Sequence, residues 1–407
     1  MLTEARSPLG FVEFISIMAL MIALTALSID AMLPALTEIG LDLSVRNAND
    51  TQLVISVIFL GTAMGQLVCG PLSDSYGRKP LVFVGITIFI IGSLLCIFTT
   101  EFSWMLWGRL LQGIGLGAPR VISTAIIRDL YQGREMAKVM SYVMTIFILA
   151  PVLAPALGQL ILFIASWRMI FTMLLIMGLL ILFWFMVRQP ETLPSKQRAR
   201  LSVQQLKNSL NRVLLNPITL GYTITAGLIS GPFVAFLSSI QQILQLQYGL
   251  GTLFPLFFAG LSIAVGSASL LNARLVMRIG MRSMVRRALI TMSTAVLIYG
   301  MFAFYLDGHP PLWSFMVFLS TTLFCTGILF GNLNALAMEP LGKIAGIGAA
   351  ITSSFATFIS VPIGMFIGLS YNGTVLPLIV GFGICSLTAI IIQHLTETRR
   401  NIGITRR

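Results

Sequence analysis

The sequence predicts an all-α membrane protein with twelve transmembrane helices in two six-helix halves, with both termini in the cytoplasm. Three observations lead to this fold class: an apolar composition, twelve long apolar segments, and basic residues concentrated in alternate loops. The chain of 407 residues is 57% hydrophobic and 10% charged, whereas a soluble protein carries about 25% charged residues. The composition therefore argues against a soluble enzyme, a disordered chain and a nucleic-acid-binding protein.

Each of the twelve apolar segments is long enough to cross a bilayer as a helix, which needs about 20 apolar residues. Helices are expected because every backbone polar group in the bilayer core must find its partner inside the protein. The segments fall at residues 11–35, 52–71, 81–99, 104–127, 138–164, 169–187, 217–240, 251–273, 288–305, 312–336, 344–370 and 374–393. Little sequence remains for a domain outside the membrane.

The basic residues set the expected orientation, because cytoplasmic loops of membrane proteins are enriched in lysine and arginine. With the N-terminus inside, only Arg46 and Arg168 of the 26 basic residues fall in outer loops, while Arg109 and Arg120 fall within the fourth segment. The net charge of +12 is then explained by anionic headgroups of the inner leaflet. No nucleic-acid partner is expected.

One long basic connection organises the chain into domains. Residues 189–216 form a cytoplasmic linker between an N-terminal half (1–188) and a C-terminal half (217–394), and a basic cytoplasmic tail follows (395–407). The loop around Gly77 recurs around Gly280, although the second copy lacks the acidic residue. Two related six-helix halves are typical of transporters with a binding site near the middle of the membrane.

Asp30 is an ionisable residue in an apolar context near the outer end of the first segment, and such residues usually mark function. Burial favours the protonated form of a carboxyl group, and a nearby cation favours the ionised form. Asp30 is therefore a candidate proton-binding group. Arg109 lies at a similar depth, so a pair with Asp30, direct or through water, is geometrically reasonable. The alternative for Asp30 is a carboxylate at a helix end in interfacial water.

The fourth segment carries a polar stripe. At about 100° per residue, Arg120 returns to within about 20° of the face of Arg109, roughly 16 Å deeper. Gln112, Ser123 and Thr124 lie near the same face. The stripe predicts an interior cavity for substrate and proton coupling. The alternative for Arg120 is a structural role, in which its guanidinium binds carbonyl groups of a neighbouring helix.

The loop after the second segment predicts a gate on the cytoplasmic side. Gly70 and Gly77 allow a tight turn. Asp74 can bond at a helix N-terminus, and Arg78 can pair with an acid, for which Asp129 is the best candidate. Such a cluster can hold the cytoplasmic side closed and break when the halves move. The alternative is an ordinary turn with surface charges.

The fifth segment combines small residues with two prolines. Ala150, Ala154 and Gly158 recur at four-residue spacing, which allows close helix crossing, and Pro151 and Pro155 bend the helix. Glycine pairs elsewhere, such as those at 61 and 65 and at 113 and 117, also predict close packing.

Aromatic side chains suggest further cavity-lining positions, namely Tyr142 in the fifth segment and Phe233 and Phe236 in the seventh. The four cysteines lack metal-binding spacing, and neither histidine has a ligand partner nearby. No metal ion or cofactor is expected.

These motifs resemble the major facilitator superfamily. Residues 70–78 are similar to its signature G-x-x-x-D-x-x-G-R, with Ser75 where a basic residue is usual. Arg109-Leu-Leu-Gln112-Gly113 is similar to the fourth-span motif R-x-x-Q-G. The resemblance implies that the arginine of this motif takes part in proton coupling. Ala154, Pro155 and Gly158 resemble the fifth-span antiporter motif G-P-x-x-G-G, with Ala154 and Gln159 in place of two of its glycines.

Three further segments, 28–36, 166–168 and 190–194, are similar to the Bcr/CflA group of drug-resistance transporters. This resemblance implies proton-driven export of drugs such as phenicols and bicyclomycin from bacteria, across the inner membrane. The expected partners are a small drug or xenobiotic, protons as the coupling ion and the lipid bilayer, and a monomer is expected. The alternatives are an uptake symporter or a metabolite exporter of the same fold. A membrane enzyme or sensor is disfavoured, because neither a catalytic cluster nor an output domain is recognisable.

Overall fold

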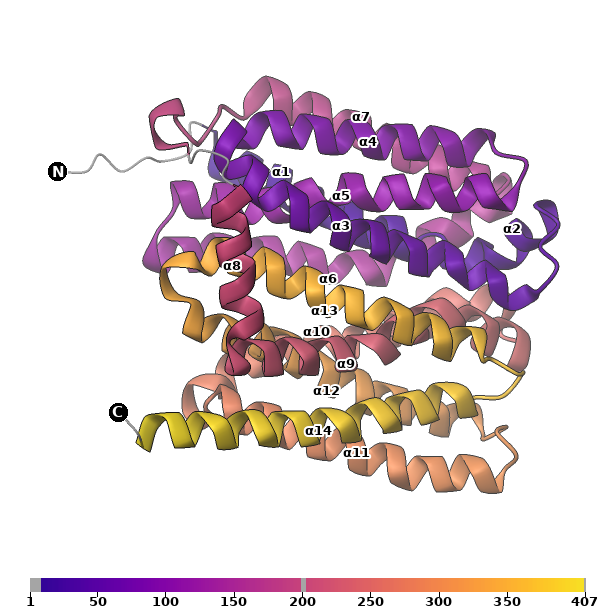
Figure 1. The fold of residues 1–407 in the computed structure, drawn as a ribbon. Coiled ribbons are helices and arrows are strands. Elements are labelled where there is room, and N and C mark those ends of the chain that lie inside the picture. Colours follow the sequence, from indigo (N-terminus) through magenta and orange to yellow (C-terminus); the bar gives the residue numbers. More distant parts are fainter. Residues whose placement is uncertain (1–8, 199–202, 406–407) are drawn as a thin grey trace. The chain divides into compact units, whose positions relative to one another are not determined.

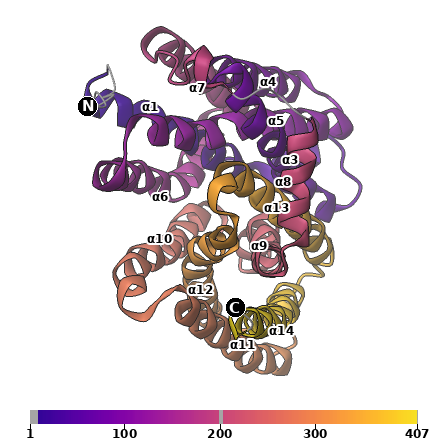
Figure 2. The same ribbon diagram turned by 60° about the vertical axis from the view of Figure 1, so that its left-hand side comes forward.

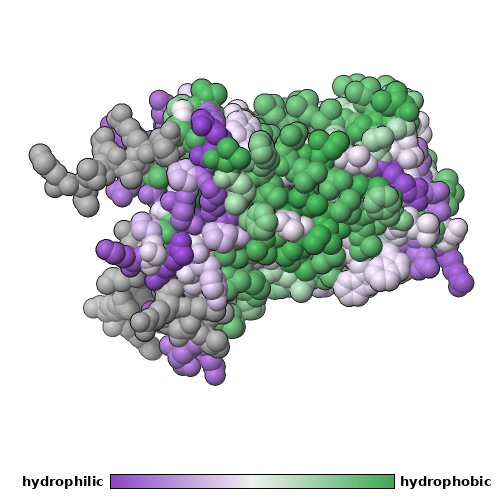
Figure 3. Space-filling view, turned by 90° about the horizontal axis from the view of Figure 1, so that it is seen from above, coloured by the Kyte–Doolittle hydropathy of each residue, from purple (hydrophilic) through white to green (hydrophobic). Residues whose placement is uncertain are grey.

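The computed structural model describes residues 9–198 and 203–405, and the described residues form helices and connecting turns without a strand. Among the described residues, twelve helices are long and apolar enough to cross a membrane, which confirms the predicted all-α fold with twelve spans. The cytoplasmic position of both termini stays a prediction. On the face shown in Figure 3, hydrophobic side chains cover the middle and hydrophilic side chains gather at both ends. Residues 1–8, 199–202 of the expected linker and 406–407 of the expected tail lie outside the described residues.

The chain divides into two compact units. The first comprises Met1–Arg46 and Val57–Leu206, and the second comprises Asn47–Ser56 and Lys207–Arg407. The boundary at Leu206 falls inside the expected linker, but Asn47–Ser56 leaves the expected N-terminal half and groups with the second unit.

Polar side chains explain why Asn47–Ser56 groups with the second unit. Asn49 donates through Nδ2 to the carbonyl oxygen of Leu369 at 3.0 Å. Gln52 donates through Nε2 to Gln242 Oε1 at 2.5 Å. Apolar periodicity carries no information about such long-range polar partners, so the sequence alone placed this segment with its neighbours in the chain.

The first unit is built around α1 and α5. The bounds of its helices are α1 (Phe11–Asp30), η1 (Leu33–Ala35), α2 (Leu36–Asp42), most of α3 (Leu53–Tyr76), α4 (Arg78–Phe98), α5 (Phe102–Leu130), α6 (Gly133–Ile164), α7 (Arg168–Arg188) and η3 (Ser195–Gln197). Helix α1 packs on α5, α6 and α7, and α4 packs on α5 and α7. Most of α1 is therefore buried.

Glycines bring α3 and α5 into backbone contact. A Cβ atom at Gly61 would lie 2.3 Å from the carbonyl oxygen of Leu110, and one at Gly65 would lie 2.2 Å from that of Ile114. A Cβ atom at Gly113 would likewise meet the α3 backbone at 2.3 Å. No larger residue fits this crossing without displacing a helix, which agrees with the packing that the glycine pairs predict.

The second unit is built around α9 and α12. The bounds of its helices are η2 (Ala48–Gln52), α8 (Val203–Leu215, from Lys207 on), α9 (Pro217–Gln241), η4 (Gln242–Gln247), η5 (Gly251–Leu253), α10 (Phe254–Ile279), α11 (Met281–Tyr305), α12 (Leu312–Met338), η6 (Glu339–Ile344), α13 (Ala345–Leu369) and α14 (Leu376–Thr405). Helix α9 packs on α12, α13 and α14, whereas α10 and α11 each pack on α12 and barely touch one another.

The expected linker and tail are partly helical. Helix α8 buries Ser209 and Val213 on one side and exposes Lys207 and Arg212 on the other. This amphipathic pattern is typical of a helix that packs one side against the protein and exposes the other to solvent. Figures 1 and 2 show α8 lying crosswise to the direction of α9, with the end of α8 at the start of α9. Helix α14 continues into the region expected as a tail and ends at Thr405.

Candidate functional site

Asp30 is the last residue of α1 and is 4% exposed. The chain then turns through η1, where Pro34 occupies the first helical turn. No ion pair or side-chain hydrogen bond is recorded for Asp30 among the described residues. A carboxylate in this position is costly as an ion. The proton-binding role of Asp30 stays a prediction.

Arg109 lies on α5 and is fully buried. Its guanidinium donates to Gln112 Oε1 at 2.8 Å and to the carbonyl oxygen of Ser28 at 2.9 Å. Gln112 in turn donates through Nε2 to Ser93 Oγ at 2.8 Å, and the Arg109 guanidinium lies 5.8 Å from the centre of the Phe171 ring. This network ties α5 to α1, α4 and α7.

The network brings the Arg109 guanidinium to the end of α1 that carries Asp30. There it binds the carbonyl of Ser28, two residues before Asp30. Arg109 can therefore stabilise the C-terminal end of α1 through the backbone, where carbonyl groups lack helical partners. A pair between Arg109 and Asp30, direct or through water, stays a prediction.

The fifth-span motif lies against the same end of α1. Ala154 is fully buried on α6. A Cβ atom at Gly158 would lie 2.0 Å from the carbonyl oxygen of Ala31 and 3.2 Å from Cγ of Pro34. Gly158 thus allows the α6 backbone to touch the residue that follows Asp30. Pro155 is also buried, so all three motif positions are buried and Gly158 is the one that meets the end of α1.

The predicted polar stripe on α5 separates into two environments. Gln112 and Ser123 are fully buried, and Ser123 bonds to the carbonyl of Pro119 at 2.6 Å. Arg120 and Thr124 are instead exposed. No ion pair is recorded for Arg120 in the part of the chain that the structure describes. The choice between a substrate contact and a structural role for Arg120 stays a prediction.

Arg78 forms the centre of an ion cluster at the junction of α3 and α4. Its side chain is 5% exposed and contacts Asp74 Oδ1 at 2.5 Å and Asp129 Oδ2 at 3.0 Å. It also donates to Ser73 Oγ at 2.8 Å. The expected pairing of Arg78 with Asp129 is therefore present. Gly77 has φ +108°, a conformation that favours glycine, and this turn starts α4 beside the cluster.

Glu191 completes this cluster, and sequence reasoning missed its role. Its carboxylate accepts hydrogen bonds from the backbone N–H groups of Arg78 at 2.9 Å and Lys79 at 3.0 Å. These are the N-terminal donors of α4, which have no helical partner. Thr192 adds a bond to Asp129 Oδ2 at 3.2 Å. The sequence signal that could have indicated this role is that Glu191 is an acidic residue within an otherwise basic linker.

The second unit contains a comparable cluster that the sequence did not reveal. Arg282 follows Gly280, whose φ is +82°, and contacts Glu339 at 2.5 Å and Glu397 at 3.2 Å. The Tyr222 hydroxyl donates to Glu397. The second copy of the loop thus also has a paired arginine, two residues after its glycine. Its acidic partners come from α14 and from the turn that follows α12.

The proposed aromatic lining residues have different surroundings. Phe236 is 2% exposed and stacks on Phe258 with 6.1 Å between ring centres. Phe233 is half-buried and meets Phe330 edge to face at 5.3 Å. Tyr142 is exposed and lies against Phe11 at the start of α1. Phe236 is therefore part of the helix packing, whereas Phe233 and Tyr142 retain accessible surface.

Comparisons with known proteins agree with this architecture. A family model described as Major Facilitator Superfamily matches residues 9–365. The MFS-type transporter YdgK of Bacillus subtilis, itself named as uncharacterised, is 31% identical over 359 residues, which is 87% of this chain and 88% of the relative. A bicyclomycin resistance protein homolog of Haemophilus influenzae is 27% identical over 408 residues, covering 95% and 96% of the two chains.

A solved structure has the same fold. The crystal structure of a D-xylose-proton symporter superposes with a TM-score of 0.74 at 15% identity, covering 94% of this chain and 97% of the other. The twelve spans, the family match and the bacterial relatives support one identification. The chain belongs to the major facilitator superfamily and is a multi-pass transporter, not an enzyme, of the bacterial inner membrane.

Proposed function

We propose that this transporter exports small drug-like compounds in exchange for protons, by alternating access. The observation that carries the proposal is the buried carboxyl of Asp30 at the end of α1, beside the motif glycine Gly158 and the Arg109 bond to Ser28. The likeness to a bicyclomycin resistance protein homolog supports a drug as the substrate.

Asp30 is the proposed proton carrier. It binds a proton from the outer side, and loss of its charge removes the cost of an ion in apolar packing. Protonation favours the state that releases substrate outward, and the proton then leaves on the inner side. Arg109 stabilises the end of α1 and thereby adjusts the proton affinity. The membrane potential contributes about 2.3 kcal/mol per transported charge per 100 mV.

Arg120 is the proposed substrate-facing cation of α5. It is exposed although it lies well inside a spanning helix. A cation at such depth usually faces a water-filled cavity or a pathway for ions or substrate. Thr124, one turn further along α5, is exposed as well. These two side chains can orient a polar group on an otherwise apolar drug.

The Arg78 cluster and Glu191 form the proposed cytoplasmic gate. Buried ion pairs stabilise one arrangement only when both partners stay in place. Movement of α5 relative to the turn between α3 and α4 would break the ion pair between Arg78 and Asp129. The intact pair would then belong to the state that is closed on the cytoplasmic side, and the broken pair to the open state. This role adds to the structural role that the bonds already indicate.

Drug susceptibility tests the proposal. A pump-deleted bacterial host expressing the chain is challenged with chloramphenicol, florfenicol and bicyclomycin, beside Asp30→Asn and with membrane expression verified for both. Resistance that disappears in the variant is expected. Absence of resistance to every compound would contradict drug export. In that case, uptake measured in right-side-out and inside-out vesicles would separate a nutrient symporter from a metabolite exporter.

A further inference from the structure

The hairpin between α10 and α11 carries an unusual concentration of arginines. Arg274 and Arg278 lie on the last turns of α10, and Arg286 and Arg287 lie on the first turns of α11. All four are exposed, and none makes a recorded ion pair with a carboxylate in the described parts of the chain. The fifth arginine of the hairpin, Arg282, is held by two glutamates.

The corresponding turn of the first unit differs in this respect. There the arginine after the turn glycine, Arg78, is buried and paired with Asp74 and Asp129. In the second unit Arg282 forms the ion pairs with carboxylates at the turn. The four remaining arginines are therefore not needed for ion pairing there. Their positive charge is left for a partner outside the described chain.

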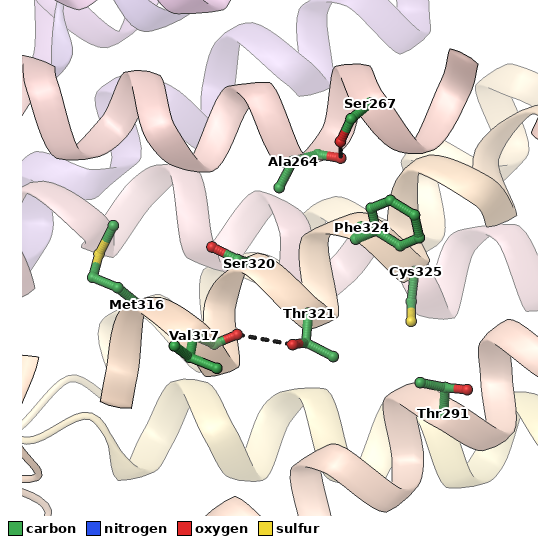
Figure 4. Close-up of a pocket in the computed structure, with 9 residues that line it drawn as sticks. All are labelled: Ala264, Ser267, Thr291, Met316, Val317, Ser320, Thr321, Phe324 and Cys325. Atoms are coloured by element: carbon green, nitrogen blue, oxygen red, sulfur yellow. Dashed lines mark hydrogen bonds between the residues drawn. The ribbon is translucent and has the colours of Figure 1, made fainter. Parts of the chain in front are cut away.

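A pocket lies on the same helices, closer to the middle of the membrane. It has a volume of about 480 Å³ and is lined by α10, α11 and α12. Figure 4 shows Ala264 and Ser267 on α10 and Thr291 on α11, with the α12 side chains between them. Because α10 and α11 both pack on α12 but hardly on each other, they form the two walls of a groove with α12 as its floor.

The rim of this pocket is apolar and accessible. Val317, which lines the pocket, is 61% exposed, and Leu270, three residues after Ser267 on α10, is 65% exposed. On spanning helices such surfaces contact the hydrocarbon of the membrane. The pocket therefore opens toward lipid acyl chains, as a shallow hollow on the helix surface.

Helical geometry places the arginines and the pocket in line. Arg274 and Arg278 both lie within about 20° of the face of Ser267, and Arg274 is about 10 Å further along α10. Arg287 precedes Thr291 by one turn on the same flank of α11. The distance from the hairpin to the pocket thus matches part of one leaflet, whose hydrocarbon is about 15 Å thick.

We propose that the α10–α11 groove binds one anionic phospholipid. Arg274, Arg278 and Arg287 hold its phosphate headgroup, and one acyl chain follows the groove into the pocket at Ser267 and Thr291. Charge complementarity selects the anionic headgroup, and the apolar groove selects a lipid over a soluble phosphate. The site is independent of the transported substrate and lies at the membrane surface that the basic loops assign to the cytoplasm.

Native mass spectrometry of the full chain in detergent tests the headgroup. Phosphatidylglycerol is expected to remain bound where phosphatidylcholine does not. The triple variant Arg274→Gln, Arg278→Gln and Arg287→Gln is expected to lose affinity by roughly a hundredfold, because each cation near the surface contributes about fivefold.

A matched triple variant removes the same charge elsewhere. Arg128→Gln and Arg134→Gln alter exposed arginines of the first unit, and Arg286→Gln alters the flank of α11 away from Thr291. This control is expected to keep selective binding. Equal loss in both triple variants, or equal binding of both lipids by the wild type, would overturn the proposal.

The acyl chain is tested separately. Thr291→Phe fills the pocket end of the groove and is expected to weaken binding of long-chain phosphatidylglycerol while leaving the dihexanoyl form unaffected. Excess glycerol phosphate is expected not to displace the long-chain lipid. Displacement by glycerol phosphate would overturn the lipid proposal and identify a soluble phosphate as the ligand, and unchanged long-chain binding in Thr291→Phe would overturn the placement of the chain.

Discussion

Replacing Gly158 by alanine tests whether the contact between α6 and the end of α1 is as close as the structure indicates. The new Cβ would lie 2.0 Å from the Ala31 carbonyl oxygen, where real Cβ contacts stay beyond 3.0 Å. The obstacle is backbone, so no side-chain rotation relieves it. One helix must move by about 1 Å, and overpacking of this kind costs about 1–3 kcal/mol.

A second glycine supplies the control for this substitution. Gly260 lies on α10, and a Cβ atom added there would have nothing within 4 Å of it. Both substitutions gain the same helix preference of about 1 kcal/mol for alanine over glycine. The difference between Gly158→Ala and Gly260→Ala therefore isolates the clash and is expected to be about 1–3 kcal/mol in unfolding free energy.

Thermal and denaturant unfolding of the purified variants in detergent measures this difference in stability. Drug efflux measures whether the displaced helix also impairs transport. Gly158→Ala is expected to unfold more easily than Gly260→Ala and to lose efflux at matched expression. Equal stability of the two variants would refute the close approach of α6 to Ala31 and, with it, the argument that this motif shapes the proton site.

Three further substitutions separate packing, gating and substrate contact. Arg78→Gln is expected to destabilise the protein by about 3 kcal/mol. This is the lower end of the range for a broken buried ion pair, because the side chains of Asp74 and Asp129 are 33% and 17% exposed. Equal stability of the variant and the wild type in denaturant unfolding would exclude a tight cluster. Phe236→Ala is expected to lose about 3–5 kcal/mol as a packed core side chain, and a folded variant with altered drug selectivity alone would contradict that placement. Arg120→Gln is expected to change stability by less than about 0.5 kcal/mol while lowering efflux; unfolding instead of a transport defect would indicate a structural arginine.

The spans and the arginine cluster could be predicted from the sequence because each depends on local pattern. Apolar runs define the helices wherever the bilayer is the solvent. Arg78 and Asp129 could be matched because they fall at the same expected membrane boundary and have opposite charge. Both inferences need only the depth of a residue along its own helix, which its position in the segment supplies.

Other features depend on neighbours that periodicity does not identify. Helical geometry places Arg109 and Arg120 on the same face of α5. In the structure α1 and α7 cover Arg109, whereas Arg120 is exposed. Glu191 caps α4 from a linker more than a hundred residues away in sequence. Asn47–Ser56 joins the second unit through amide side chains. In each case the deciding partner is remote in the chain.

The central claim is that Asp30 couples proton movement to export. The most direct measurement follows proton flux and drug movement together in proteoliposomes holding either the wild type or Asp30→Asn at matched orientation and amount. An imposed pH gradient is expected to drive drug against its own gradient only in the wild type, and added drug is expected to move protons only there. Undiminished gradient-driven transport in Asp30→Asn would contradict the assignment of Asp30 as the proton carrier.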